Sequence, residues 1–154
     1  TDKLNIFKVS EVRYPGLTYC HSGWLNKKRR FLFVNDELDE RRNPEVETTT
    51  TYILRVQNLE RPRFSRAWSN GSTAIDHNSM VRGNFLFQSN FTSGLRVFKV
   101  KRPRFPREVA FFDTRPGDDA PIFRGAWGVH AALPSGTVLV SDIQLGLFVL
   151  YFPD

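Results

Sequence analysis

Two blocks of sequence each occur twice, and this repetition constrains the fold more than any other feature. Residues 83–89 and 136–142 each begin with Gly and a polar residue and continue with three apolar residues. Residues 93–98 and 145–150 share a Gly followed by a mostly apolar run. The offset is 53 residues for the first block and 52 for the second. Such a regular offset indicates a small structural unit repeated along the chain.

Helix signals are few, and short apolar runs are many. The 9 Pro and 10 Gly recur at short intervals and would interrupt most helices. A looser third copy of the repeat covers residues 30–36 and 52–56. Alternating apolar and polar residues, as in residues 95–100, are typical of strands. We expect strands at residues 4–9, 30–34, 50–56, 84–88, 95–100, 108–112, 137–140 and 145–152.

Repeats of this length favour one all-β architecture over the others. A sandwich would not repeat with this period, whereas propeller blades of about four strands repeat every 40–50 residues or so. We therefore predict an all-β partial β-propeller with about three blades of four-stranded antiparallel sheet. The approximate blades are residues 15–68, 74–122 and 123–154, with residues 1–12 as the tail of a preceding blade. The predicted core is Phe31, Phe33, Ile53, Leu54, Leu86, Leu95, Val97, Val138, Val140, Leu147 and Val149.

An open run of blades leaves strand edges without partners, and ring closure is how propellers protect them. We therefore expect either that the chain is cut from a longer protein or that a second copy closes the ring. The first residues are consistent with the former, since they look like the middle of a strand. No apolar run is long enough to span a membrane, and no segment matches a nucleic-acid-binding motif.

The histidines follow the repeat. His77 and His130 each stand six residues before the Gly that opens a repeat block, and His21 stands ten residues before Phe31 of the looser copy. A short turn insertion would absorb the difference for His21. Because the innermost strands of a propeller line one channel, we expect the three imidazoles to lie at one equivalent blade position and to converge.

A polar cluster near this channel is the first candidate site. Imidazole binds Zn²⁺ or iron, and carboxylates bind harder ions or act as acids and bases. The structural alternative is that these side chains bond the backbone at the blade ends. We predict no cofactor, and we keep binding of a divalent metal ion as an alternative. The acidic residues 35–40 lack the Gly and the closing Glu of a calcium loop, so we expect a solvated loop. The candidates are His21, Asp36, Glu37, Asp76, His77, Asn78 and His130.

Basic residues supply a second candidate. The formal net charge is +6, and Arg alternates with Pro and Phe in residues 61–68 and 102–107. Arg beside an aromatic ring can bind glycans or phosphates. The alternative is a connection between blades whose Phe packs between the sheets while the Arg residues stay in water. The anion-binding candidates are Arg61, Arg63, Arg102 and Arg104.

Several segments together resemble a known family. They are residues 19–25, 31–40, 76–78, 88–97, 110–114, 125–127, 134–142 and 146–149. Their sequences and order resemble the choice-of-anchor B family, which has LVIVD-type repeats. The resemblance covers nearly the whole chain. It implies the C-terminal blades of an exported, surface-associated propeller. The sequence departs from the family pattern at Cys20, where Thr is expected, and at His130, where an aromatic residue is more usual.

These observations lead to three functional expectations. The first is a non-enzymatic binding scaffold, extracellular or on the cell surface, with a protein or glycan partner and no nucleic acid. The second is a metal-dependent enzyme with its site at the channel, formed by His21 and His77. The third is an anion- or glycan-binding module that uses the Arg-rich segments.

Overall fold

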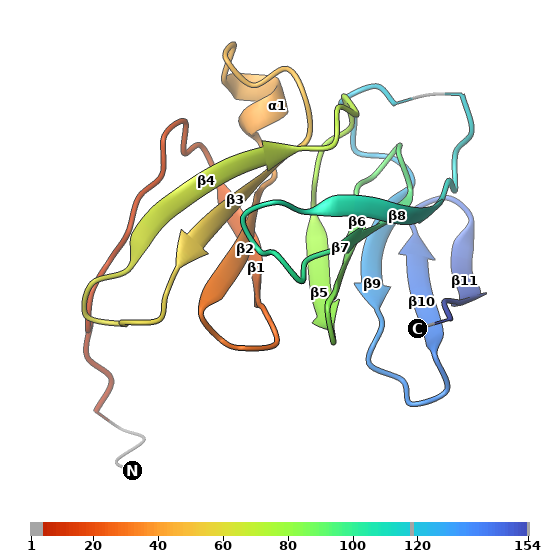
Figure 1. Ribbon diagram of the computed structural model, residues 1–154. Coiled ribbons are helices and arrows are strands. Elements are labelled where there is room, and N and C mark those ends of the chain that lie inside the picture. Colours follow the sequence, from red (N-terminus) through yellow and green to blue (C-terminus); the bar gives the residue numbers. More distant parts are fainter. Residues whose placement is uncertain (1–4, 118, 154) are drawn as a thin grey trace.

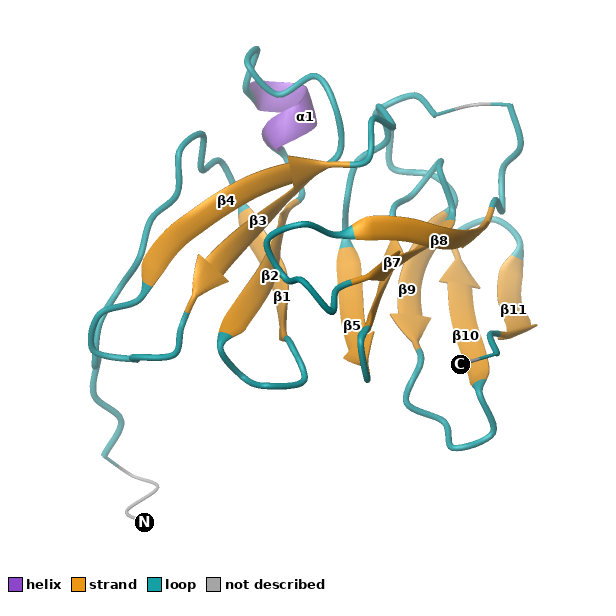
Figure 2. Cartoon of the chain, in the orientation of Figure 1, coloured by secondary structure: helices purple, strands orange, loops and turns teal. Residues whose placement is uncertain are grey.

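The computed structural model describes residues 5–117 and 119–153, which form three antiparallel sheets and one short helix (Figures 1 and 2). The prediction of an all-β chain is confirmed. The first sheet contains β1 (Cys20–Leu25), β2 (Phe31–Asp36), β3 (Thr50–Arg55) and β4 (Arg63–Ser69). The second contains β5 (Asn78–Arg82), β6 (Phe85–Ser89), β7 (Leu95–Lys99) and β8 (Arg107–Phe112). The third contains β9 (Ala126–His130), β10 (Thr137–Asp142) and β11 (Gly146–Tyr151), and helix α1 (Asp39–Arg42) follows β2.

Within each sheet, every strand pairs with the next strand of the chain. Close turns make this meander possible. Gly83 has a φ of 59° in the turn between β5 and β6, a conformation that glycine adopts at little cost. Gly94, before β7, has a φ of 73°, and a Cβ there would collide with the backbone of Phe112 and Thr114. None of the sheets in the described part of the chain closes on itself.

The three sheets stand side by side in chain order (Figure 1). The first strand of each sheet faces the next sheet, because β1 contacts β5, and β5 and β6 contact β9. Strands β4 and β8 are the last of their sheets and lie on the outer side, away from these contacts. The first strands of the first two sheets, β1 and β5, therefore meet near the middle of the molecule.

Apolar residues fill the spaces between the sheets. Between the first and second sheets, Phe33 and Ile53 pack with Leu86, Phe98 and Val100. Between the second and third, the core consists of Met80, Phe87, Leu95, Val97, Ala126, Ala131, Val138 and Val140. On the other face of the first sheet, residues 12–14 cover a third core of Tyr14, Val34, Tyr52 and Leu54.

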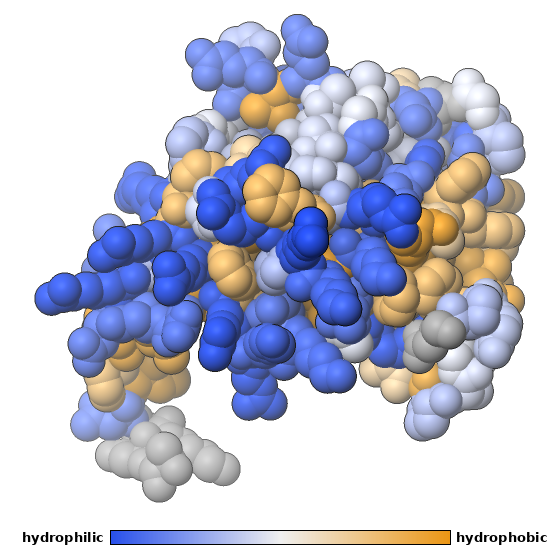
Figure 3. Space-filling model, viewed as in Figure 1, coloured by the Kyte–Doolittle hydropathy of each residue, from blue (hydrophilic) through white to orange (hydrophobic). Residues whose placement is uncertain are grey.

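The predicted core is correct except at one edge. Phe33, Ile53, Leu54, Leu86, Leu95, Val97, Val138 and Val140 are buried, and Phe31 is partly buried. The prediction is wrong for Leu147 and Val149, whose exposed fractions are 62% and 67%. Successive strand residues point to opposite faces, and Phe148 and Leu150 take the inward positions of β11. Figure 3 shows apolar surface on the side of the molecule where β10 and β11 lie.

Three expectations about elements are corrected. Residues 5–9 form no strand, and Leu4 lies outside the described residues. Residues 61–68 are not a connection between sheets, because most of them belong to β4. Trp68 packs against Phe98 of the second sheet, with ring centroids 4.9 Å apart, while Arg63 and Arg66 are exposed. The third sheet has three strands among the described residues, where about four were predicted.

Candidate functional site

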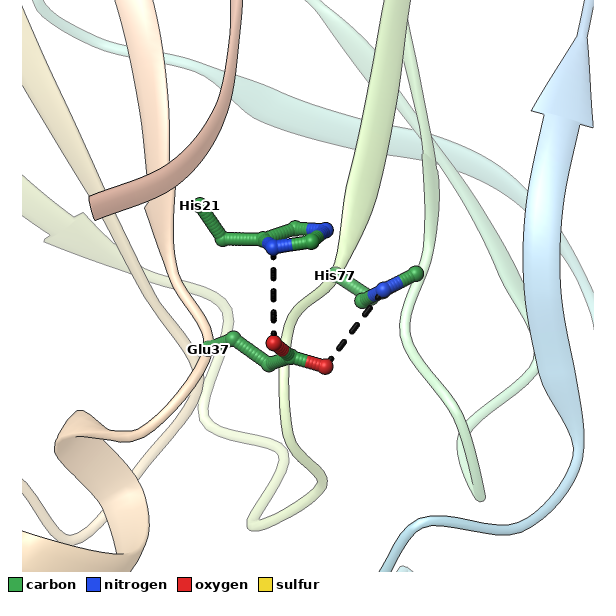
Figure 4. Close-up of side chains that lie close together, drawn as sticks. All are labelled: His21, Glu37 and His77. Carbon is green, nitrogen blue, oxygen red and sulfur yellow. Dashed lines mark ion pairs between the residues drawn. The ribbon is translucent and has the colours of Figure 1, made fainter. Parts of the chain in front are cut away.

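Three of the predicted site residues come together where the first two sheets meet (Figure 4). His21 lies on β1 at an irregularity in its pairing with β2, between Cys20 and Ser22. Glu37 follows β2 directly, and His77 directly precedes β5. The contact between β1 and β5 therefore carries the two imidazoles to the same carboxylate.

The Glu37 carboxylate contacts the edges of the two imidazole rings, which stack on each other. Its Oε2 is 3.4 Å from His21 Nδ1, and its Oε1 is 3.4 Å from His77 Nε2. One ligand atom from each residue lies within 4.8 Å of the other two. The side chains of His21, Glu37 and His77 are 26%, 13% and 1% exposed. The site is thus nearly dry at His77 and reachable from solvent at His21.

The protonation of His77 is set by the backbone. Its Nδ1 lies 2.6 Å from the carbonyl oxygen of Trp127. A carbonyl can only accept, so Nδ1 carries the proton and donates it, which leaves a lone pair on Nε2. Burial lowers the pKa of His77 below its ordinary value, which favours this neutral form. Nε2 has no hydrogen-bond partner among the described residues.

Aromatic rings hold the His77 ring in place. The rings of His21, Trp127 and Phe91 have centroids 4.3, 4.4 and 4.8 Å from it. Ser22 on β1 donates its hydroxyl to the His77 carbonyl at 2.6 Å. The lone pair of Nε2 is therefore fixed toward a carboxylate oxygen, and two acceptors that face each other need either a proton or a metal cation between them. Two imidazoles and a carboxylate are ligands suited to Zn²⁺ and iron.

The remaining predicted residues near this site have structural contacts. Asp36 accepts hydrogen bonds from the Tyr14 hydroxyl at 2.9 Å, from Thr18 N at 2.8 Å, from Tyr19 N at 2.6 Å and from the Thr18 hydroxyl. It thereby attaches residues 14–19 to the first sheet. Asn78 donates its amide to the same Trp127 carbonyl at 3.1 Å.

His130 is not part of the cluster, so the three histidines are not equivalent. A two-residue turn joins β5 to β6, whereas residues 131–136 join β9 to β10. The longer connection shifts the register: His130 pairs with Leu139 inside the third sheet, and His77 stands before its strand. Equal spacing to a glycine therefore did not mean an equal position.

The expectation of a solvated acidic loop is wrong. Asp36 and Asp39 are fully buried, and both Glu40 carboxylate oxygens are inaccessible. Three carboxylate oxygens, one each from Asp39, Glu40 and Asp76, lie within 4.8 Å of one another. Of these three residues, only Asp76 was among the predicted site residues. Asp39 and Glu40 could have been predicted because carboxylates that closely follow a buried strand lie at the end of the sheet rather than in water.

The four nominated arginines are exposed and lie on the outer side of the first two sheets. Arg61 and Arg63 line a pocket with Arg55, and Arg102 lines another with Lys99, Lys101 and Arg107. The guanidinium groups of Arg66 and Arg104 lie 4.8 and 6.0 Å from the centre of the Phe105 ring. The Phe residues of these segments do not pack between the sheets, because Phe64 and Phe105 are 36% and 56% exposed.

Comparisons with known proteins add no assignment: no protein-family model matches the chain, and no curated protein matches it significantly. Within residues 5–117 and 119–153, no helix has the length and apolar character needed to cross a membrane.

Proposed function

We propose that this chain is a non-enzymatic binding scaffold made of three β-propeller blades, exported and surface-associated, that recognises its ligand at a metal centre. Three consecutive antiparallel meanders whose first strands contact one another support the propeller arrangement. The expected location follows from the resemblance to the choice-of-anchor B family.

One observation carries the ligand site. The His77 lone pair and the Glu37 carboxylate face each other at 3.4 Å, with the tautomer fixed by the Trp127 carbonyl. Metal-binding histidines commonly donate their other ring N–H to a carbonyl or carboxylate, which orients the ligand. His21 supplies the third ligand from the solvent side. A metal ion held by three protein ligands keeps a position open for an oxygen or nitrogen atom of a bound partner.

Zn²⁺ binding to the chelator-treated chain tests this centre. We expect one Zn²⁺ per chain by calorimetry. At about 100 times the dissociation constant, binding adds about 2.7 kcal/mol to the free energy of unfolding. For a chain of this size that raises the Tm by roughly 5–10 °C.

The His21→Ala and Glu37→Gln variants are expected to weaken Zn²⁺ binding at least tenfold. His130→Ala is the matched control, because His130 is exposed and lies outside the cluster. Absence of Zn²⁺ binding in the parent chain would contradict the proposal, as would equal binding by all variants. Hydrolysis of nitrophenyl esters or phosphates by the Zn²⁺-loaded chain, lost in His21→Ala, would favour a metal-dependent enzyme over a scaffold.

Anion binding by the outer basic face is the second candidate. Arg55, Arg61, Arg63, Lys99 and Arg102 are exposed, and no described carboxylate lies within ion-pair distance of them. Such an uncompensated surface attracts sulfated or phosphorylated polymers, and salt screens the attraction. We expect retention on heparin that falls with ionic strength and is reduced in Arg61→Glu/Arg63→Glu. Heparin retention that is unchanged in Arg61→Glu/Arg63→Glu but reduced in Arg13→Glu, an exposed residue before β1, would count against this candidate.

A further inference from the structure

A second cluster of ligating atoms lies beside the histidine centre but uses different chemistry. Asp39 and Glu40 are the first residues of α1, in the connection from β2 to β3. Asp76 belongs to the connection that enters β5 of the second sheet. One carboxylate oxygen from each of the three residues lies within 4.8 Å of the others. Two segments far apart in sequence therefore bring only oxygen ligands to one point.

Several of these oxygens have no partner. Asp76 is 0% exposed; its Oδ2 accepts the Asn35 amide at 2.7 Å, and its Oδ1 has no hydrogen-bond partner among the described residues. Both Glu40 carboxylate oxygens are equally inaccessible, and the Asp39 carboxyl is close enough for a side-chain hydrogen bond, which two acids form only by sharing a proton. Asp39 is better satisfied, since it accepts Glu40 N and the Tyr52 hydroxyl, each at 2.8 Å. A buried carboxylate oxygen with no donor is costly, so a proton or a cation is needed at this point.

The cluster also lacks a protein cation. Among the described residues, no Lys, Arg or His forms an ion pair with Asp39, Glu40 or Asp76. The neighbouring Arg41 is directed elsewhere, with its guanidinium 5.0 Å from the Phe123 ring centre. Burial and mutual repulsion raise the pKa of Glu40 to about 11 and also raise the pKa of Asp76. Three carboxyl groups in a dry space are stable as carboxylates only with a compensating positive charge.

We propose that Asp39, Glu40 and Asp76 bind a Ca²⁺ ion that joins the β2–β3 connection of the first sheet to the entry of β5. Carboxylate oxygens are the ligands of hard cations, whereas the softer Zn²⁺ prefers the imidazoles of the neighbouring centre. Ca²⁺ accepts an irregular set of six to eight or so oxygens, which backbone carbonyls and water can complete. Mg²⁺ demands a near-octahedral set and is expected to bind more weakly. This site does not depend on the His21, Glu37 and His77 centre.

The test is Ca²⁺ titration of the whole chelator-treated chain, followed by calorimetry and by thermal unfolding. We expect one Ca²⁺ per chain at this site and a rise in Tm with Ca²⁺ concentration. Glu40→Gln and Asp76→Asn keep the side-chain shapes and are expected to weaken Ca²⁺ binding at least tenfold. Glu47→Gln is the matched control, an exposed carboxylate in the same connection, and should bind Ca²⁺ as the parent chain does.

Two further measurements separate the outcomes. Glu40→Gln removes a buried carboxyl, so its Tm without Ca²⁺ should equal or exceed that of the parent chain, which shows that lost binding is not lost folding. His21→Ala should keep Ca²⁺ binding, which separates this site from the histidine centre. The proposal is overturned if millimolar Ca²⁺ neither binds nor raises the Tm of the parent chain. It is also overturned if Glu40→Gln and Asp76→Asn bind Ca²⁺ as tightly as Glu47→Gln.

Discussion

At the scale of single residues, buried polar side chains determine how the parts of this chain are joined. Asp36 holds residues 14–19 through its four accepted hydrogen bonds. Gln88 on β6 donates to the Thr51 hydroxyl on β3 at 2.9 Å. Asn35 donates to Asp76 across the same interface. Each such bond adds only modestly to the free energy of unfolding, but a buried donor or acceptor that is left unpaired lowers it considerably.

Removing the Asp36 carboxylate is therefore expected to destabilise the chain strongly. Asp36→Ala leaves the Tyr14 hydroxyl and the Thr18 and Tyr19 N–H groups without their acceptor. We expect a loss of about 3 kcal/mol in the free energy of unfolding, measured in urea. Hydrogen exchange at residues 14–19 should quicken more than exchange in β6. A loss no larger than that of the exposed control Glu47→Ala would contradict this account.

At the scale of elements, connections matter as much as strands. The β2–β3 connection contains α1 and supplies Glu37 to one cluster and Asp39 and Glu40 to the other. The bulge in β1 and the segment before β5 supply the facing side chains. The strands fix where these connections begin and end, and the connections then place the carboxylates.

The buried carboxyls of this connection make stability depend on pH when no divalent cation is bound. The pKa of Glu40 is raised from an ordinary 4.5 to about 11, and the pKa values of Asp39 and Asp76 are raised in the same direction. The folded chain then holds protons that the unfolded chain releases. Stability is greatest below the ordinary pKa and is lost as the pH rises toward the folded value.

We expect the free energy of unfolding to fall between pH 7 and 9 by about 1.4 kcal/mol per pH unit for each carboxyl that stays protonated. This range lies above the lowered pKa of His77, so that imidazole adds no slope. Denaturation in chelator at several pH values measures the effect, and Glu40→Gln should flatten it. If the free energy of unfolding depends on pH in Glu40→Gln as strongly as in the control Glu47→Gln, the Glu40 carboxyl is not the group responsible.

At the scale of the whole molecule, the faces of the sheets are unequally covered. The second sheet is covered on both faces, by the first and third sheets. The outward face of the third sheet exposes Leu145, Leu147, Val149 and Tyr151 by 62–72%. These residues lie on or beside β11, which pairs only with β10 within the described residues. An apolar face beside an open strand edge favours contact with a further sheet.

We expect this face to make the isolated chain associate with itself. Light scattering across a range of concentrations should show a mass above that of one chain. Leu147→Ser/Val149→Thr should return it to a monomer with an unchanged circular dichroism spectrum. Leu59→Ser is the control, since Leu59 is 67% exposed in a turn of the first sheet. A parent chain that stays monomeric at high concentration would argue against ring closure by a second copy or by further blades.

Local sequence pattern predicted most of the core and seven strands, which are β2, β3, β6, β7, β8, β10 and β11. It did not predict β1, β4, β5 and β9 as strands. Alternation in residues 95–100 and 137–140 depends only on neighbours two positions apart, so β7 and β10 and their inward residues were predictable. His21, Glu37 and His77 were also nominated, because their side chains are chemically distinctive. Their contact was not determined, since the spacing argument placed His130 with them equally.

Packing between the sheets determines which side chains meet and which are covered. The contact of β1 with β5 brings His21 and His77 to Glu37, and the longer β9–β10 connection removes His130. Packing buries Asp39, Glu40 and Asp76 together, while Leu147 and Val149 stay exposed for lack of a covering sheet among the described residues. Local sequence specifies backbone conformation through short-range sterics and period. Burial and convergence depend on the length of connections and on sheets that meet across many residues, which no local pattern records.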